Sequence, residues 1–111
     1  MQRYAMIVGI KSEAIEEYER IHAEVWPEVL DNIRRHGITN YSIFRLGNTL
    51  FGYYEYVGND WEADMADMKN DLKNVEWWAI TDNMQYAVPE AADSDQPGNL
   101  WTFAKEVFHT D

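Results

Sequence analysis

The first residues of the chain alternate between apolar and polar positions. A period of two over residues 2–10 is typical of a β-strand that buries one of its faces. The apolar face carries Tyr4, Met6, Val8 and Ile10. We therefore predict that the chain begins with a strand, and we expect Ser12 to cap the helix that follows it.

Over residues 13–36 the apolar positions recur at intervals of three and four, which is the spacing of one face of an α-helix. This face carries Ile15, Tyr18, His22, Val25, Val29 and Ile33. Pro27 lacks the backbone N–H that a helix interior needs, so we predict a kink or two abutting helices near Trp26. Gly37 is expected to end the second helical piece.

Two more strands are predicted at residues 38–46 and 49–57, joined by Gly47 and Asn48 as a hairpin turn. Beyond this hairpin the pattern is mostly helical. The remaining predicted features are a second helix capped by Asn59 or Asp60, a helical piece over residues 75–88, a loop over 89–99 and a last strand over 100–109.

This order of elements is that of the split βαβ, ferredoxin-like fold. We predict an α+β protein with a single domain over residues 1–111, because one hydrophobic core serves a chain of this length. Helices cover only one face of such a sheet. The other face is expected to carry Tyr4, Phe44 and Tyr53 or their neighbours, and two copies packed sheet to sheet would cover it. We therefore expect a homodimer.

The charge pattern narrows the choice of ligand. A net charge of −11 argues against nucleic acid as a partner, because phosphate binding needs a basic surface, and it favours a small neutral ligand. Asp60, Asp64, Asp67 and Asp71 recur at helical spacing, and we interpret them as a solvated helix face rather than a metal site. The chain has no cysteine, no stretch suited to crossing a membrane and no secretion signal, so we expect a cytoplasmic protein.

Of the three histidines, His22 is the strongest candidate for chemistry. Tyr18 lies one helical turn before it, so a hydroxyl and an imidazole can share one site. An imidazole titrates near neutral pH, which suits general acid–base catalysis. The alternative is that His22 is a hydrogen-bonded core residue. We expect His36 to bond the carbonyls of a helix end, and His109 to be peripheral.

Five blocks of sequence, spread over nearly the whole chain, form a specific pattern. They are EEYERIHAEVWPEV at 16–29, HGITNYSIF at 36–44, LFGYYEY at 50–56, WW at 77–78 and EVFH at 106–109. This pattern resembles that of the L-rhamnose mutarotases, with HxxxWPE followed by HGxxNYSI as its most specific part.

The resemblance implies a fold of the dimeric α/β-barrel type and an enzyme that interconverts the α and β anomers of a 6-deoxyhexose. L-Rhamnose is the substrate that it implies first, and L-fucose is an alternative. It also implies that the ring opens and recloses by general acid–base catalysis, with His22 as the proton donor and no cofactor. The side chains that would contact the sugar are Tyr18, Tyr41, Trp77 and Trp78.

Alternatives exist both for the preferred sugar and for the class of function. The family commonly has methionine where this chain has Thr81, near the tryptophan pair, and this departure leaves the sugar open. A cofactor-free monooxygenase of ferredoxin-like fold would also use histidine and aromatic residues in a cleft. A third reading is a module that binds a sugar without changing it.

Overall fold

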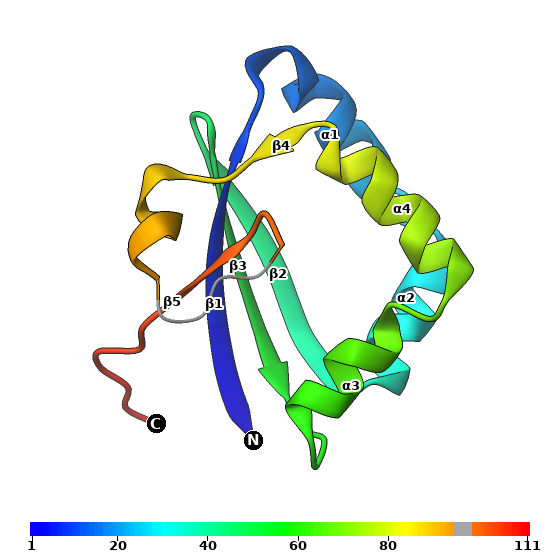
Figure 1. Ribbon diagram of the computed structural model, residues 1–111, viewed down its shortest axis with the longest axis vertical. Helices are drawn as coiled ribbons and strands as arrows, with labels where there is room; N and C mark the ends of the chain where they lie inside the picture. The colour runs from blue at the N-terminus through cyan, green and yellow to red at the C-terminus, as the bar shows by residue number, and fades with distance from the viewer. Residues whose placement is uncertain (95–98) are drawn as a thin grey trace.

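The computed structural model describes residues 1–94 and 99–111, and it shows a curved antiparallel sheet with helices along one side (Figure 1). The strands are β1 (Gln2–Ile10), β2 (Ile38–Leu46), β3 (Thr49–Tyr56), β4 (Gln85–Tyr86) and β5 (Thr102–Ala104). The helices are α1 (Ile15–His22), α2 (Pro27–Arg35), α3 (Trp61–Met68) and α4 (Leu72–Asp82), with 3-10 turns at Ser12–Ala14 and Pro89–Asp93.

Neighbouring strands follow the order β2-β3-β1-β4, and β5 also pairs with β1. All of these pairs are antiparallel, and the longest ladder joins β1 to β3. The β2–β3 hairpin turns at Gly47, whose φ of +59° lies in the left-handed region that glycine adopts without strain. The predicted α+β class and split βαβ topology are confirmed.

The helical stripe over residues 13–36 is interrupted where the sequence predicts. Pro27 occupies the first turn of α2, where its missing N–H removes no helical hydrogen bond. Gly37 follows the end of α2 with a φ of +81°, and its N–H donates to the carbonyl of Arg34. The result is two abutting helices, α1 and α2, rather than one kinked helix.

Several predicted boundaries were wrong. Ser12 does not cap a helix; its hydroxyl oxygen accepts a hydrogen bond from Asn48 Nδ2 at 2.9 Å. Helix α4 begins earlier than predicted because Asp71 accepts from two backbone N–H groups of its first turn. The chain then enters β4, a strand that was not predicted, and β5 is much shorter than the predicted strand over 100–109. Residues 95–98 of the predicted loop lie outside the described residues.

The side chains between the sheet and the helices form two apolar clusters. The first is built around Met6, Ile38, Tyr54 and Met68, and the second around Val8, Ile10, Tyr18 and Leu50. Trp101 packs against both of them. Tyr4 packs against the first cluster, stacked on Trp61, so its predicted place on the open face of the sheet was wrong. Tyr4 lies two residues before Met6 in β1, so both side chains are on the face of the sheet that points toward the helices.

The opposite face of the sheet is left uncovered by the helices. The strand register places Phe44, Phe51 and Ile7 side by side across β2, β3 and β1. Phe44 is 65% exposed and Phe51 is 39% exposed, and such exposure is unusual for phenylalanine. Tyr53 lies on the same face, as predicted, one register step away.

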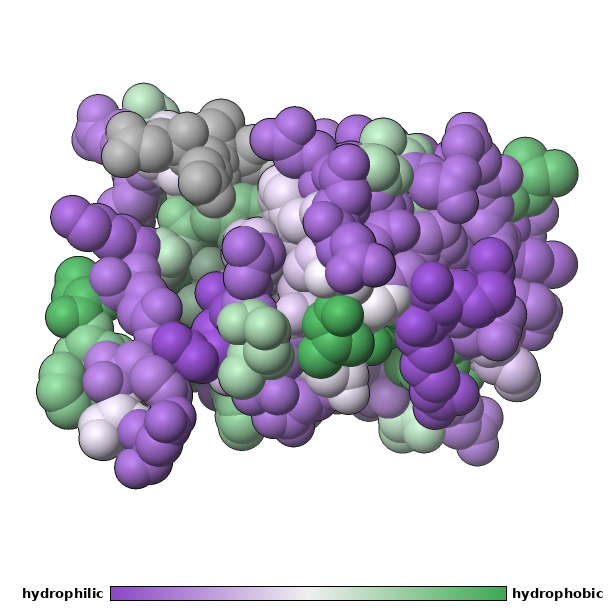
Figure 2. Space-filling view, turned by 90° about the horizontal axis from the view of Figure 1, so that it is seen from below, coloured by the Kyte–Doolittle hydropathy of each residue, from purple (hydrophilic) through white to green (hydrophobic). Residues whose placement is uncertain are grey.

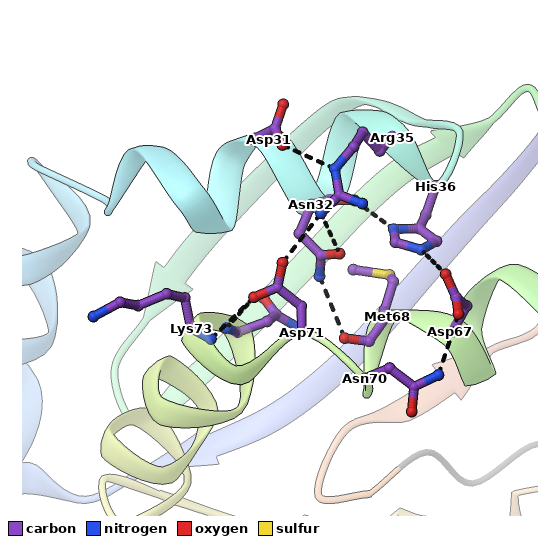
Figure 3. Close-up of polar contacts among 10 residues, drawn as sticks. Asp31, Asn32, Arg35, His36, Asp67, Met68, Asn70, Asp71 and Lys73 are labelled. Carbon is purple, nitrogen blue, oxygen red and sulfur yellow. Dashed lines mark hydrogen bonds and ion pairs between the residues drawn. The ribbon is translucent and has the colours of Figure 1, made fainter.

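The acidic residues of the 60–71 segment serve separate purposes, because the break between α3 and α4 divides them. Asp60 caps α3 and Asp71 caps α4, while Asp67 faces His36 of the helix end opposite (Figure 3). The prediction that all four lie on one helix face was therefore wrong, whereas Asp60 does cap α3 as predicted. Within the described residues, no group of three or more histidine or acidic side chains is placed to hold a metal ion.

The surface at the end where both termini lie is mostly hydrophilic, with hydrophobic side chains scattered among polar ones (Figure 2). This distribution accords with the excess of acidic over basic residues. In the part of the chain that the structure describes, no helix combines the length and the apolar character that crossing a membrane requires.

Candidate active site

Tyr18 and His22 occupy one face of α1, one turn apart, and their rings stack with centroids 3.9 Å apart. The two planes are inclined by 23°. Tyr18 is buried against the second apolar cluster, whereas His22 at the last position of the helix is half-buried. The helical spacing thus places the hydroxyl-bearing ring beneath the imidazole, and the imidazole keeps access to solvent.

The hydrogen bond of His22 fixes its tautomer. Its Nδ1 lies 2.7 Å from the carbonyl oxygen of Tyr18, and a carbonyl only accepts, so Nδ1 carries the proton. Burial lowers the pKa of His22 and outweighs the bond to Tyr18, which raises it. The ring is therefore neutral at pH 7, and Nε2 keeps a free lone pair. A lone pair in this state is what a general base needs.

Two tryptophans form the wall beside His22. The edge of Trp77, from α4, meets the imidazole at a centroid distance of 5.2 Å, and Trp26 meets Trp77 at the same distance. Trp26 stands between α1 and α2, so the interruption at Pro27 is what places this ring here. Trp26 thus packs on the residue that contacts the candidate catalytic imidazole.

Tyr41 and Trp78 lie in the neighbouring cluster, whereas the ring contacts of His22 are with Tyr18 and Trp77. Both pack against the first apolar cluster, from β2 and α4 respectively. A β-bulge in β2 directs Tyr41 inward, since the register shifts between Thr39 and Ser42 and Asn40 adopts a φ of +48°. The sequence pattern gave no signal for this bulge.

Three tyrosines lie near one another inside the fold, with the ring centroids of Tyr41 and Tyr54 5.5 Å apart. Burial raises the pKa of Tyr18 to about 12 and that of Tyr54 to about 12. Burial also raises the pKa of Tyr41, and the nearby Tyr18 and Tyr54 raise it further. These groups stay protonated at neutral pH and can donate hydrogen bonds, but they cannot serve as bases. His22 is therefore the member of this group that can exchange a proton near pH 7.

Two buried carboxamides on the 74–85 segment were missed by the sequence analysis. Gln85, in β4, donates from Nε2 to the Tyr18 hydroxyl over 3.4 Å. Asn74 lies on the face of α4 that also carries Trp77 and Trp78, and it is fully buried. Its spacing of three and four residues from the tryptophan pair was a readable signal, since such residues are neighbours on a helix.

The other two histidines lie in separate surroundings. His36 is buried where α2 ends, with Nδ1 at 2.7 Å from the Asn32 carbonyl oxygen and Nε2 at 2.8 Å from Asp67 Oδ2 (Figure 3). The predicted bond to a helix-end carbonyl is thus confirmed. His109 lies near the C-terminus and contacts Asp111. Neither of them joins the His22 group.

Two surface hollows formed by the described residues do not coincide with this group. One hollow of about 720 Å³ is lined by residues that include Tyr4, Trp61 and Phe103, and another of about 470 Å³ by residues that include Arg3 and Glu106. None of the five predicted site residues lines either of them. The candidate site is thus an aromatic region between α1, α4 and the sheet, not one of these two open hollows.

Comparison with known proteins shows which sequences this chain resembles. The sequence matches the L-rhamnose mutarotase family over residues 3–110. An L-rhamnose mutarotase from Oceanobacillus iheyensis is 32% identical over 113 residues, and the match covers 100% of both chains. An L-fucose mutarotase from Xanthomonas campestris pv. campestris is 34% identical, with 97% of this chain and 87% of that protein covered.

Two solved structures share the fold. An L-rhamnose mutarotase from Formosa agariphila superposes with a TM-score of 0.77 at 22% identity, covering 100% of both chains. A candidate antibiotic biosynthesis monooxygenase from Nitrosomonas europaea superposes with a TM-score of 0.57 at 12% identity, covering 96% of this chain and 100% of that one. Because the family match extends over nearly the whole sequence, this chain is a member of the L-rhamnose mutarotase family, isomerases that interconvert sugar anomers.

Proposed function

We propose that this protein interconverts the α and β anomers of L-rhamnose in the cytoplasm, with His22 as its acid/base. The observation that carries this proposal is the state of His22: its Nδ1–H is held by a backbone carbonyl, so a neutral ring presents a free Nε2. The family match supplies the class of substrate, and L-fucose is the second candidate because a relative bears that name.

In the proposed reaction, Nε2 of His22 accepts the proton of the anomeric hydroxyl. The C1–O5 bond breaks, C1 becomes an aldehyde carbonyl, and the imidazolium donates the same proton to O5. Rotation about C1–C2 presents the other face of the aldehyde, and the reverse sequence closes the ring as the other anomer. Tyr18 and Tyr41 are proposed to hold hydroxyl groups of the sugar, since their raised pKa values keep them protonated as donors.

The tryptophans complete the proposed site. A pyranose offers C–H groups on its faces and hydroxyls at its rim, so an aromatic wall suits it. Trp77 contacts His22 and is proposed to face the sugar. Trp78 packs against the first apolar cluster and is proposed to bound the site on that side. Neither step of the reaction requires a redox change, so acid–base groups suffice for it.

Saturation-transfer NMR tests this function directly. The anomeric protons of L-rhamnose, L-fucose and D-glucose resonate separately, so irradiation of one anomer transfers saturation to the other only as fast as they exchange. We expect catalytic amounts of the protein to accelerate this exchange for L-rhamnose, to a smaller extent for L-fucose, and not for D-glucose. Unchanged exchange with all three sugars, from a folded protein, would remove the proposal.

The fold neighbour from Nitrosomonas europaea bears the name of a monooxygenase, so oxygenase activity is the second function to measure directly. Oxygen consumption with quinol or phenolic compounds would indicate a cofactor-free monooxygenase. A protein that binds L-rhamnose without accelerating its exchange would instead be a sugar-binding module. The NMR and oxygen measurements together separate the three classes.

We also propose that the open sheet face pairs two copies of the chain. Phe44→Glu should then convert a dimer into a monomer, because the charge would have to be buried among apolar side chains. Light scattering coupled to size-exclusion chromatography measures the mass. Leu72→Glu is the matched control, since Leu72 is 78% exposed but lies on α4, away from this face. A wild-type protein that elutes as a monomer at micromolar concentration would contradict the proposal.

A further inference from the structure

Asn74 is the most anomalous polar side chain of the described residues. Its exposed fraction is 0%, and neither its Nδ2 nor its Oδ1 has a hydrogen-bond partner. A carboxamide buried in this way loses its hydrogen bonds to water without replacement, which is unfavourable. Only one other side-chain atom in the described residues shares this condition, and it is Oε1 of Gln85.

One of these carboxamides contacts the proposed catalytic group, and the other shares a helix face with its tryptophans. Gln85 contacts the Tyr18 hydroxyl, and Tyr18 stacks on His22. Asn74 precedes Trp77 and Trp78 by three and four residues, so at about 100° per residue it points between their two directions on α4. Gln85 is therefore in contact with the aromatic group, and Asn74 projects from α4 between its two tryptophans.

Asn32 shows that this fold can satisfy a buried carboxamide. It is also 0% exposed, but its Nδ2 donates to the Met68 carbonyl at 3.5 Å and its Oδ1 accepts from Arg35 at 3.4 Å (Figure 3). Asn74 has the same chemistry with a partner for neither atom, and Gln85 has a partner for Nε2 but none for Oε1. Unused hydrogen-bonding capacity next to a proposed active site is typical of groups whose partner arrives with the ligand.

We propose that Asn74 and Gln85 determine the specificity of the enzyme by bonding hydroxyl groups of the sugar. This inference rests on the proposed function and names the groups that recognise the hydroxyls of the substrate. Asn74 can both donate to and accept from a hydroxyl, and Gln85 Oε1 accepts from a second one. The substrate is therefore an aldose whose ring hydroxyls are intact at two positions away from C1, and a deoxy analogue leaves one carboxamide unpaired.

Kinetics with single-deoxy analogues test this assignment. Exchange rates of L-rhamnose and of its 2-, 3- and 4-deoxy analogues are measured by saturation transfer over a range of sugar concentrations. For the wild-type protein we expect kcat/KM to fall about ten- to hundredfold for one analogue per carboxamide. In Asn74→Leu, the KM for L-rhamnose should rise with kcat little changed, and the penalty for one analogue should disappear. Gln85→Met should remove the penalty for a different analogue.

The stability of the variants separates a substrate contact from a structural role. Asn74→Leu should unfold in urea at a denaturant concentration equal to or above that of wild type, because an unpaired polar group is lost. Asn32→Leu is the matched control: it should unfold at lower urea and leave the KM for L-rhamnose unchanged. Gln85→Met provides the readout if Asn74→Leu does not fold.

The outcomes also separate this inference from the proposed function. Wild-type exchange together with unchanged kinetics in Asn74→Leu and Gln85→Met would overturn the assignment and leave the function standing. A strong loss of stability in Asn74→Leu with unaltered analogue discrimination would show that the carboxamide is structural. If the wild-type protein exchanges no sugar, the proposed function fails and this assignment fails with it.

Discussion

His22→Ala should slow the catalysed interconversion of anomers by about 10²- to 10⁴-fold, the usual contribution of one positioned acid/base group. The reason lies in the geometry of the site. The imidazole is the group there that can gain and lose a proton near pH 7, because Tyr18 and Tyr41 have raised pKa values. Saturation-transfer NMR on L-rhamnose, at matched concentrations of folded variant and wild type, measures the loss.

His109→Ala is the matched control for this experiment. His109 has the same side chain but lies near the C-terminus, paired with Asp111, so its removal should leave the exchange rate unchanged. Circular dichroism and the urea midpoint establish that His22→Ala remains folded, which we expect since its ring is only half-buried. Full activity of a folded His22→Ala protein would refute the proposed mechanism, and equal losses in both variants would indicate a general effect.

The pH dependence of the wild-type exchange rate is a second test of the role of His22. Burial lowers the pKa of His22, so the neutral ring persists below the value near 6.5 that an unperturbed histidine has. The catalysed rate should therefore hold steady from pH 8 to 6.5 and decline only at lower pH, where the ring becomes protonated.

The parts of the molecule that follow from local patterns could be predicted from the sequence. Alternation gave β1, helical spacing brought Tyr18 and His22 together, and the restrictions on Pro27 and Gly37 set the limits of α2. In each case the deciding interaction joins residues close in the chain. For each of these features, the local sequence pattern was therefore enough to predict the structure.

Features that depend on distant parts of the chain could not be predicted in this way. The bulge at Asn40, which turns Tyr41 toward the interior, depends on the register between β2 and β3. The two-residue strand β4 exists because its edge of β1 is free to pair, and it is what brings Gln85 to Tyr18. Such tertiary pairings leave no repeating signal in the residues themselves.

The contact between His36 and Asp67 joins α2 to α3 and was likewise not predicted. Both nitrogens of His36 face acceptors, so the doubly protonated ring fits the site best (Figure 3). Burial lowers the pKa of His36, but the bonds to Asp67 and Asn32 and the charge of Asp67 outweigh both that effect and the opposing charge of Arg35. The pKa is raised in the folded state.

His36→Ala should reduce the free energy of unfolding by about 2–3 kcal/mol at pH 6, because it removes two hydrogen bonds and a buried ring. Since the folded pKa of His36 exceeds the unfolded value near 6.5, the charged state contributes fully below pH 6.5. That contribution is lost as the pH rises through the folded pKa. The difference between wild type and His36→Ala should therefore be smaller at pH 9 than at pH 6, as measured by urea unfolding.

Two carboxylate variants show whether this pH dependence comes from the pair. Asp67→Asn removes the charge that His36 faces, so its stability should change less than that of wild type between pH 6 and pH 9. Asp31→Asn is the matched control, because the Asp31 side chain is 67% exposed, close to the 65% of Asp67, but it pairs with Arg35. Its difference from wild type should be small and equal at both pH values. If Asp67→Asn kept the full pH dependence of wild type, the titrating group would be elsewhere, and the contact would join α2 to α3 without a charged histidine.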